Sequence, residues 1–306
     1  MPAIFTPQVT VYHPDVQPYI SIADYQNAPT AVDTSALIPG GSPAANLMAL
    51  WVVIRNASGW ANNLCRQVLA ATLDTQMKSR LYVRSDGTVR VKCDFWPVLE
   101  VDSFLAGPSP STMAAITDPQ DMFLIGRKVL SVPVAGISGN SVGQLQFPGP
   151  LMPGDRAYAQ WSYWNGWPHT TLAHAVGISD TSIQVTNSMP AALAGRVMTI
   201  WDGASTEQVT IASSFTGGTT LPIVGTPQNA HALLVAPQST MVSTFSDDVR
   251  QAVISLTSSL IKTRGAEAYE MDVIGQEPSK SELIEGGGLE DLAVAVDLLS
   301  FYRRAA

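Results

Sequence analysis

Apolar residues recur at helical spacing in the segment that begins at Pro43. Ser42 can serve as its N-cap, and proline fits the first helical position because its missing N–H would have no partner there. The pattern predicts an amphipathic helix over residues 43–65, with a kink or break near Gly59. The apolar face of this helix consists of Leu47, Leu50, Trp51, Ile54, Ala57, Ala61 and Leu64.

A second segment with the same period lies late in the chain. Ser246 is the expected N-cap, because its hydroxyl can accept a hydrogen bond from a backbone N–H of the first turn. Asp247 and Asp248 follow at the positive end of the helix dipole, and Gly265 can adopt the left-handed conformation that ends a helix. A helix is therefore predicted over residues 246–264. Its apolar stripe consists of Val249, Val253, Leu256 and Leu260.

Two further helices are predicted nearer the ends of the chain. A short helix is expected within residues 21–28, and a longer one over residues 289–304, after an acidic, glycine-ended linker. The longer helix has acidic residues at its start and arginines at its end, which the helix dipole favours. Its apolar face consists of Leu289, Leu292, Ala293, Val296 and Leu299.

Between the helices the hydrophobic period changes to the alternation of strands. Asp86-Gly87 separates two alternating runs, which is a strong hairpin signal, so two paired strands are predicted around this turn. Pro97 is expected at the start or edge of a strand because proline cannot donate to a ladder. A strand should follow it over residues 98–104. Further strands are predicted within residues 122–134, 141–147 and 156–167.

Residues 168–237 have little charge and are rich in Thr, Ser, Ala and Val. Short strands at regular spacing are typical of a small all-β module. Strands are predicted at 181–187, 195–203, 205–215, 217–224 and 231–237, and the second and third should form a hairpin.

The two long helices flank everything that reads as β structure, and each has one apolar face to bury. The simplest arrangement packs them against each other. The predicted fold class is α+β: a small helical core of two long amphipathic helices plus a C-terminal helix, with β-hairpins and a large inserted all-β module. The expected divisions are an extended N-terminal segment 1–42, a first part of the core 43–167, the inserted β domain 168–237 and a second part of the core 238–306.

The composition of the 306-residue chain points to assembly rather than to DNA binding. Only 14% of the residues are charged while 46% are hydrophobic, which favours a surface partly covered by partner subunits. The net charge of −8 disfavours a protein that grips nucleic-acid phosphates. An acidic surface would instead let DNA pass without sticking, through repulsion.

The two cysteines, Cys65 and Cys93, form no CxxC motif and no Cys/His cluster, so two buried reduced thiols are expected and a structural zinc site is not. The N-terminus lacks a basic region followed by an apolar one, so no signal peptide is expected. The longest apolar run, residues 47–54, is too short to cross a bilayer. A soluble protein made in a cytoplasm, with no cofactor and no membrane partner, is therefore predicted.

Three segments, taken in order, resemble the head–tail connector (head-completion or adaptor) family of long-tailed bacteriophages. The first is the helix up to "NNLCRQ" (62–67), and the second is the hairpin-plus-strand pattern "GTVRVKCDFWPVLEVDS" (87–103). The third is the capped helix "SDDVRQAVISLTSSLIKTRG" (246–265). The matching positions are Pro97, Val98, Val101, Ser103, Asp248, Ala252, Arg264 and Gly265. The segment that follows Thr170 also resembles β insertions of phage virion proteins, while the long N-terminal segment and the size of the insertion depart from the family pattern.

The resemblance implies a structural virion protein and not an enzyme. Identical subunits would form a ring beneath the portal at the virion neck, dodecameric to match the portal. The ring would join the DNA-filled head to the tail and leave a channel through which genomic DNA passes without specific binding. The implied partners are other copies of the chain, the portal protein, and the next head-completion or tail-terminator protein.

The C-terminal helix is expected either to dock on the portal or to pack within its own chain. The candidate portal-binding residues are Leu289, Leu292, Val296, Leu299, Phe301, Tyr302 and Arg303. Acidic residues after the second long helix either line the channel and repel the DNA backbone or are ordinary solvated charges. These candidates are Glu267, Glu270, Asp272, Glu282 and Glu285.

Catalysis is not expected, because the sequence contains no GxSxG, HExxH or phosphate-binding loop motif. A cluster of aromatic residues suggests an alternative function. It consists of Trp161, Tyr163, Trp164 and Trp167. Trp161, Tyr163 and Trp167 would share a strand face and either stack on a sugar or base, or fill the junction between core and insertion. A β-rich carbohydrate-binding module is therefore one alternative function. Another phage structural protein, such as a tail terminator, baseplate or decoration protein, is the other.

Overall fold

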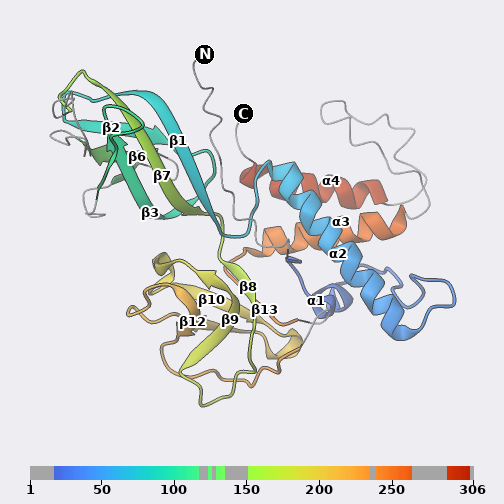
Figure 1. The fold of residues 1–306 in the computed structure, drawn as a ribbon. Coiled ribbons are helices and arrows are strands. Elements are labelled where there is room, and N and C mark those ends of the chain that lie inside the picture. Colours follow the sequence, from blue (N-terminus) through green and yellow to red (C-terminus); the bar gives the residue numbers. More distant parts are fainter. Residues whose placement is uncertain are drawn as a thin grey trace. The chain divides into compact units, whose positions relative to one another are not determined.

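The computed structural model describes residues 17–116, 123–125, 129–134, 151–234, 239–263 and 288–303. Helices and sheets are both present, so the fold is mixed α+β (Figure 1). The chain divides into two compact units: residues 71–166 make up unit 1, and the segments on either side of them make up unit 2. This division differs from the predicted one, because it falls at residue 71 and leaves the β module of 168–237 in the same unit as the helices.

Unit 1 is built from two antiparallel sheets. Their strands are β1 (Thr72–Tyr82), β2 (Thr88–Lys92), β3 (Val98–Gly107), β4 (Ala114–Ala115), β5 (Phe123–Ile125), β6 (Val129–Pro133) and β7 (Arg156–Asn165). The first sheet has the order β1-β7-β3-β4 and the second the order β2-β6-β5. Strand β3 begins directly after Pro97, as predicted. The predicted strand at 141–147 lies outside the described residues.

The Asp86-Gly87 turn forms, but the hairpin predicted around it does not. Gly87 N–H donates to the Arg84 carbonyl at 2.9 Å, and Arg84 N–H donates to the Thr88 carbonyl at 2.8 Å. Beyond the turn the strands diverge, since β1 pairs with β7 while β2 pairs with β6. The prediction was wrong because turn chemistry is local, whereas each strand takes the partner that buries its apolar face.

The core of unit 1 is filled from β7, whose side chains alternate between a buried and a half-buried face. Trp161 and Tyr163 are both fully buried on the same face. The Trp161 ring stacks on Phe104 of β3 with centroids 6.0 Å apart, and the Tyr163 hydroxyl accepts a hydrogen bond from Phe95 N–H at 3.2 Å. These aromatics are therefore core residues of the two-sheet unit.

Unit 2 contains the helices: α1 (Ile22–Asn27), α2 (Pro43–Cys65), α3 (Asp247–Lys262) and α4 (Gly288–Leu299), the last continued by a 3-10 turn (Ser300–Tyr302). All four predicted helices are confirmed. Helix α2 is capped by Ser42, whose side chain accepts from Ala45 N–H, and it runs through Gly59 without the predicted break. Among the described residues, no helix combines the length and apolar character that a membrane span requires.

Helices α2 and α3 pack against each other, as their apolar faces predicted. Leu50 and Ile54 of α2, and Val249, Val253 and Leu256 of α3, are almost completely buried in their common core. Of the remaining predicted core residues, Leu47, Trp51 and Leu260 are half-buried at its margin. Helix α4, the next helix after α3, packs against it, so α2, α3 and α4 share one core.

Two predicted helix ends differ from the structure. Ser246 occupies the N-cap position of α3, but its hydroxyl is hydrogen-bonded to the Tyr302 hydroxyl and not to a backbone N–H. Helix α4 ends at Leu299 and not near Arg304, which lies outside the described residues. Both differences have one cause, because the 3-10 turn brings Tyr302 onto the start of α3. Gly265 also lies outside the described residues.

The small β module of unit 2 has its own apolar core. Its strands are β8 (His169–Thr171), β9 (Ser182–Met189), β10 (Val197–Trp201), β11 (Glu207–Thr210), β12 (Gly218–Pro222) and β13 (Met241–Ser243). They form sheets of order β11-β10-β13-β8 and β12-β9, and the predicted hairpin appears as β10 paired with β11. The predicted strand at 231–237 is not formed by its described residues, in which His231 makes only an isolated bridge to Val176.

Arg250 joins the helices of unit 2 to this β module. Its guanidinium forms an ion pair with Asp24 of α1 at 2.8 Å and lies over the ring of Trp201 in β10, 3.2 Å from the centroid. Asp24 is held in place by a reciprocal capping box with Ser21. A planar cation of this kind is suited to binding a carboxylate and an aromatic face at once.

Asn62 is the centre of a buried polar network at the end of α2. Its side-chain oxygen accepts hydrogen bonds from the Tyr19 hydroxyl at 2.6 Å and from Leu69 N–H at 3.0 Å. The Tyr19 hydroxyl in turn accepts from Ala70 N–H at 3.2 Å. Burial raises the pKa of Tyr19 to about 12, so this hydroxyl stays protonated and keeps donating. The network fixes the N-terminal segment and the chain leaving α2 to the same point.

We expect Asn62→Ala to lower the free energy of unfolding by about 2–4 kcal/mol, because it leaves the Tyr19 hydroxyl and the Leu69 N–H buried without this acceptor. Asn63→Ala is the matched control, because Asn63 is exposed on the same helix. That variant should change stability by less than about 0.5 kcal/mol. Urea denaturation measures both values, and equal effects of the two substitutions would contradict the role given to Asn62.

His169 is buried among aromatic rings next to this network. Its Nε2 lies 2.9 Å from the Pro18 carbonyl oxygen. The centroid of its ring lies 5.3 Å from that of Tyr19 and 4.9 Å from that of Phe245. Burial lowers the pKa of His169 from 6.5 to about 4. The folded protein therefore holds this imidazole neutral at pH values where the unfolded chain protonates it.

This difference predicts a loss of stability in acid. Because the unfolded state binds the extra proton, the stabilisation by neutral His169 is complete above pH 6.5 and decreases as the pH falls towards about 4. The full difference corresponds to about 3 kcal/mol. Unfolding free energies measured from pH 7 to 4 should fall less steeply for His169→Gln than for the natural protein. Parallel curves for the natural protein and His169→Gln would contradict the prediction.

Candidate functional site

The C-terminal helix packs within its own chain through one side. Ala295 and Leu299 are buried in the helical core, with Leu292 and Leu298 half-buried beside them. Lys262 of α3 pairs with Asp291 at 2.8 Å. Since Leu299 is only 2% exposed, it is not available as a surface contact for a portal, and the alternative of intramolecular packing describes this side of the helix.

The end of the chain is fastened to α2 and to the chain that leaves it. The Cys65 thiol, whose pKa burial raises to about 12, donates to the Leu299 carbonyl at 3.8 Å. Gln67 Nε2 donates to the Tyr302 carbonyl at 3.0 Å, and the Tyr302 ring meets Trp167 edge to face at 5.1 Å. Cys65 and Cys93 are both buried and neither forms a disulfide, as predicted. Tyr302 is thus held by intramolecular contacts.

Apolar side chains of α4 also reach solvent, Val294 on the side opposite the core and Val296 on a different side of the helix. Val294 is 47% exposed, Val296 is 45% exposed and Phe301 in the following 3-10 turn is 84% exposed. Arg303 is exposed next to them. Of the candidate portal-binding residues, Val296, Phe301 and Arg303 are therefore on the surface. The side chain of Leu289 and all five candidate channel residues lie outside what the structure describes.

A second apolar surface lies on α2. Met48 and Val52 are 47% and 46% exposed, and they lie one helical turn apart. Arg55 is exposed on the same side, with its guanidinium 5.6 Å from the centroid of the Trp51 ring. A Cβ added to Gly59, one turn further along, would meet no atom within 4 Å. The outer side of α2 is consequently open and largely apolar.

The exposure of Met48, Val52 and Val294 was not predicted, because these residues lie outside the main apolar stripe of their helices. A usable signal was present, since "LMALWVVI" and "LAVAVDLL" are apolar almost all the way round. A helix with this character has two sides to cover. One side is covered by the protein's own core, and the other is not covered by any described residue.

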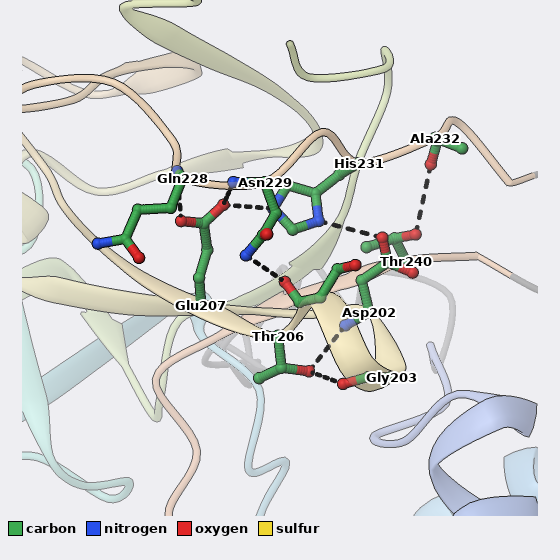
Figure 2. Close-up of polar contacts among 10 residues, drawn as sticks. Asp202, Gly203, Thr206, Glu207, Gln228, Asn229, His231, Ala232 and Thr240 are labelled. Carbon is green, nitrogen blue, oxygen red and sulfur yellow. Dashed lines mark hydrogen bonds and ion pairs between the residues drawn. The ribbon is translucent and has the colours of Figure 1, made fainter. Parts of the chain in front are cut away.

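The densest polar cluster lies in the β module around His231, whose side chain is fully buried (Figure 2). Its Nδ1 lies 3.1 Å from Asp202 Oδ2 and its Nε2 lies 2.7 Å from Glu207 Oε1. Glu207 also accepts from the backbone N–H groups of Gln228 and Asn229, at 2.7 and 3.1 Å. Burial raises the pKa of Glu207, but these accepted hydrogen bonds outweigh that effect and lower it overall.

This geometry serves structure rather than chemistry at an open site. Both ring nitrogens of His231 face a carboxylate, so neither is directed at a reactant as a general base would be. Among the described residues, no group of three or more His, Cys, Asp or Glu side chains is arranged to hold a metal ion. The imidazole instead ties the turn between β10 and β11 to residues 228–231.

The aromatic residues proposed for sugar or base stacking are not placed for it. Trp161 and Tyr163 are fully buried in the core of unit 1. Trp167 follows the end of β7 and packs against Tyr302 in unit 2. Trp164 lies on the half-buried side of β7. Trp161, Tyr163 and Trp167 therefore do not form one open stacking face. The alternation of β7 explains why, because it points Trp161 and Tyr163 into the core.

Removing the His231 imidazole tests its structural role. We expect His231→Ala to destabilise the protein by about 3 kcal/mol, because Asp202 and Glu207 lose their shared partner while staying largely desolvated. His174→Ala is the control in the same module, where the side chain is exposed and should contribute less than about 0.5 kcal/mol. Thermal and urea unfolding measure the stability of both variants. Unchanged stability of His231→Ala would contradict the structural role given to His231.

The chain was compared with models of protein families, with curated proteins and with solved structures, and none of these comparisons found a match. The function is therefore inferred from the surfaces described above and from the order of the sequence motifs.

Proposed function

We propose that the protein is a head–tail connector of a long-tailed bacteriophage. In this role it is a structural virion protein that forms a ring of identical subunits beneath the portal. The ring joins the DNA-filled head to the tail and leaves a channel for the genome. Its partners are other copies of the chain, the portal, and the next head-completion or tail-terminator protein.

One observation carries most of the proposal: the helical core leaves apolar side chains uncovered on two different helices. The outer side of α2 exposes Met48 and Val52, and α4 exposes Val294 and Val296 on two different sides, each by nearly half. In a ring, each subunit uses one surface to contact the neighbour on one side and a different surface to contact the neighbour on the other side. Apolar side chains exposed on two separate elements suit such a contact. The order of motifs along the chain agrees with this assignment.

The portal contact is proposed at the end of the described chain. Leu292 and Leu299 pack inward, which leaves the exposed Phe301 and Arg303 as the residues that can reach a partner. An exposed aromatic beside an arginine is a combination enriched at binding hot spots. The acidic residues of 267–285 remain the proposed lining of the channel, where a chain with net charge −8 would repel the phosphates of the passing DNA.

Immunogold labelling of intact virions tests the proposed station. Antibody against this chain should place gold at the head–tail junction, and one cluster of label should mark each particle. Gold on the capsid faces would instead indicate a decoration protein, and gold at the tail tip a baseplate protein. Virions that carry no label would remove the chain from the particle and overturn the proposal.

Phe301→Ser tests the portal contact separately. We expect the variant to lose at least about tenfold in affinity for the portal, because an exposed aromatic anchor is removed, while its fold and self-association are retained. Co-sedimentation with the portal encoded by the same phage measures the loss. Val224→Ser is the matched control, because Val224 is 66% exposed but lies in the β module. Equal binding by the natural protein and Phe301→Ser would place the portal contact elsewhere.

A further inference from the structure

The two uncovered helix surfaces differ in charge. The outer side of α2 carries Arg55, and residues 43–65 contain no acidic residue. The outer side of α4 carries the exposed Glu290 and Asp297, and residues 288–299 contain no basic residue. Among the described residues, Arg55, Glu290 and Asp297 form no ion pair. Each surface therefore joins a half-exposed valine, Val52 or Val294, to a charge that no described residue of the same chain neutralises.

We infer that the outer side of α4 in one copy packs on the outer side of α2 in the next copy. Val294 would lie against Met48 and Val52, with Asp297 facing Arg55. This inference rests on the proposed ring and specifies its subunit contact. It leaves Phe301 and Arg303, beyond the end of α4, for the portal.

Charge decides which surfaces meet. Two α2 surfaces placed together would oppose arginine to arginine, and two α4 surfaces would oppose carboxylates, and both arrangements are disfavoured at an interface. Only the α2–α4 pairing brings opposite charges beside the apolar residues. Such a pairing is heterologous, because different surfaces of identical chains meet, and it closes into a ring when the rotation between neighbours permits.

The local shape of α2 agrees with a close approach of another helix. Met48, Val52, Arg55 and Gly59 follow one line along α2, at intervals of four, three and four residues. The open space over Gly59 leaves the end of this line without a side chain. Because the inward sides of both helices are already buried in their own core, the contact requires no unpacking of the subunit.

Site-specific cross-linking of the full-length protein tests the pairing. Val52→Cys and Val294→Cys chains are prepared separately and treated with a short bis-maleimide. The natural protein is the control, because its two cysteines are buried and should not react. The mixture of the two variants should yield covalent dimers, while each variant alone should yield no more than the natural protein. The chain with both substitutions should yield a ladder of higher oligomers.

Exchanging the charges provides the second measurement. Arg55→Glu and Asp297→Arg should each lower the association constant by about tenfold or more, and the two substitutions together should restore it. Sedimentation equilibrium of the soluble chain gives these constants, or portal-templated assembly gives them if the free chain is monomeric. Arg196→Glu, an exposed arginine of the β module, is the control and should leave association unchanged.

The outcomes separate this inference from the proposed function. Cross-linking of Val52→Cys with itself, or of Val294→Cys with itself, would show a two-fold contact and overturn the pairing. Self-association without any cross-link in the mixture would also overturn it, while gold at the head–tail junction would still support the connector. A chain that never associates, either free or on the portal, and never labels the junction would overturn both.

Discussion

The packing of α2 against α3 is the contact on which unit 2 depends. These helices come from opposite parts of the chain, so the β module between them must begin and end near the same core. Strands β8 and β13 satisfy this requirement by pairing with each other, since His169 lies opposite Ser243 at the point where the chain enters and leaves the module. The buried faces of α2 and α3 thereby set the geometry of the inserted module, and α4 completes the core from outside.

Polar groups inside this helical core restrict how the helices can pack. Ser58 donates to the Ile54 carbonyl and accepts from Tyr19 N–H, both at 2.9 Å, and the hydroxyls of Tyr25 and Ser258 lie 3.0 Å apart. A buried hydroxyl without a partner costs free energy, so each of these pairs favours one register over its neighbours. Apolar contact supplies most of the stabilisation, and the polar pairs select the arrangement.

The sequence was sufficient for features whose causes are local. Ser42 with Pro43 marks the start of α2, and the apolar stripe of α3 identifies the side that packs, because caps and helical periodicity depend on neighbouring residues. The partner of β2 and the partner of the Ser246 hydroxyl are set by residues far away in the chain. Local signals therefore gave the Asp86-Gly87 turn correctly but not the strand pairing. The same limit applies to the candidate surfaces, since the inward side of α4 could be recognised as apolar but not as covered by α3.

Both the β module and the helical core of unit 2 pair buried polar groups internally, and both leave some apolar side chains exposed. In the β module, the fully buried His231 has both ring nitrogens paired with carboxylates. In the helical core, buried groups such as Ser58 and Asn62 are also paired, yet apolar side chains remain exposed on α2 and α4. The outer valines are not part of the helical core, and their exposure costs solubility. Their retention is explained if a second copy covers them. Because the two surfaces carry opposite charges, the α2 surface of one copy is then covered by the α4 surface of the next and not by another α2 surface.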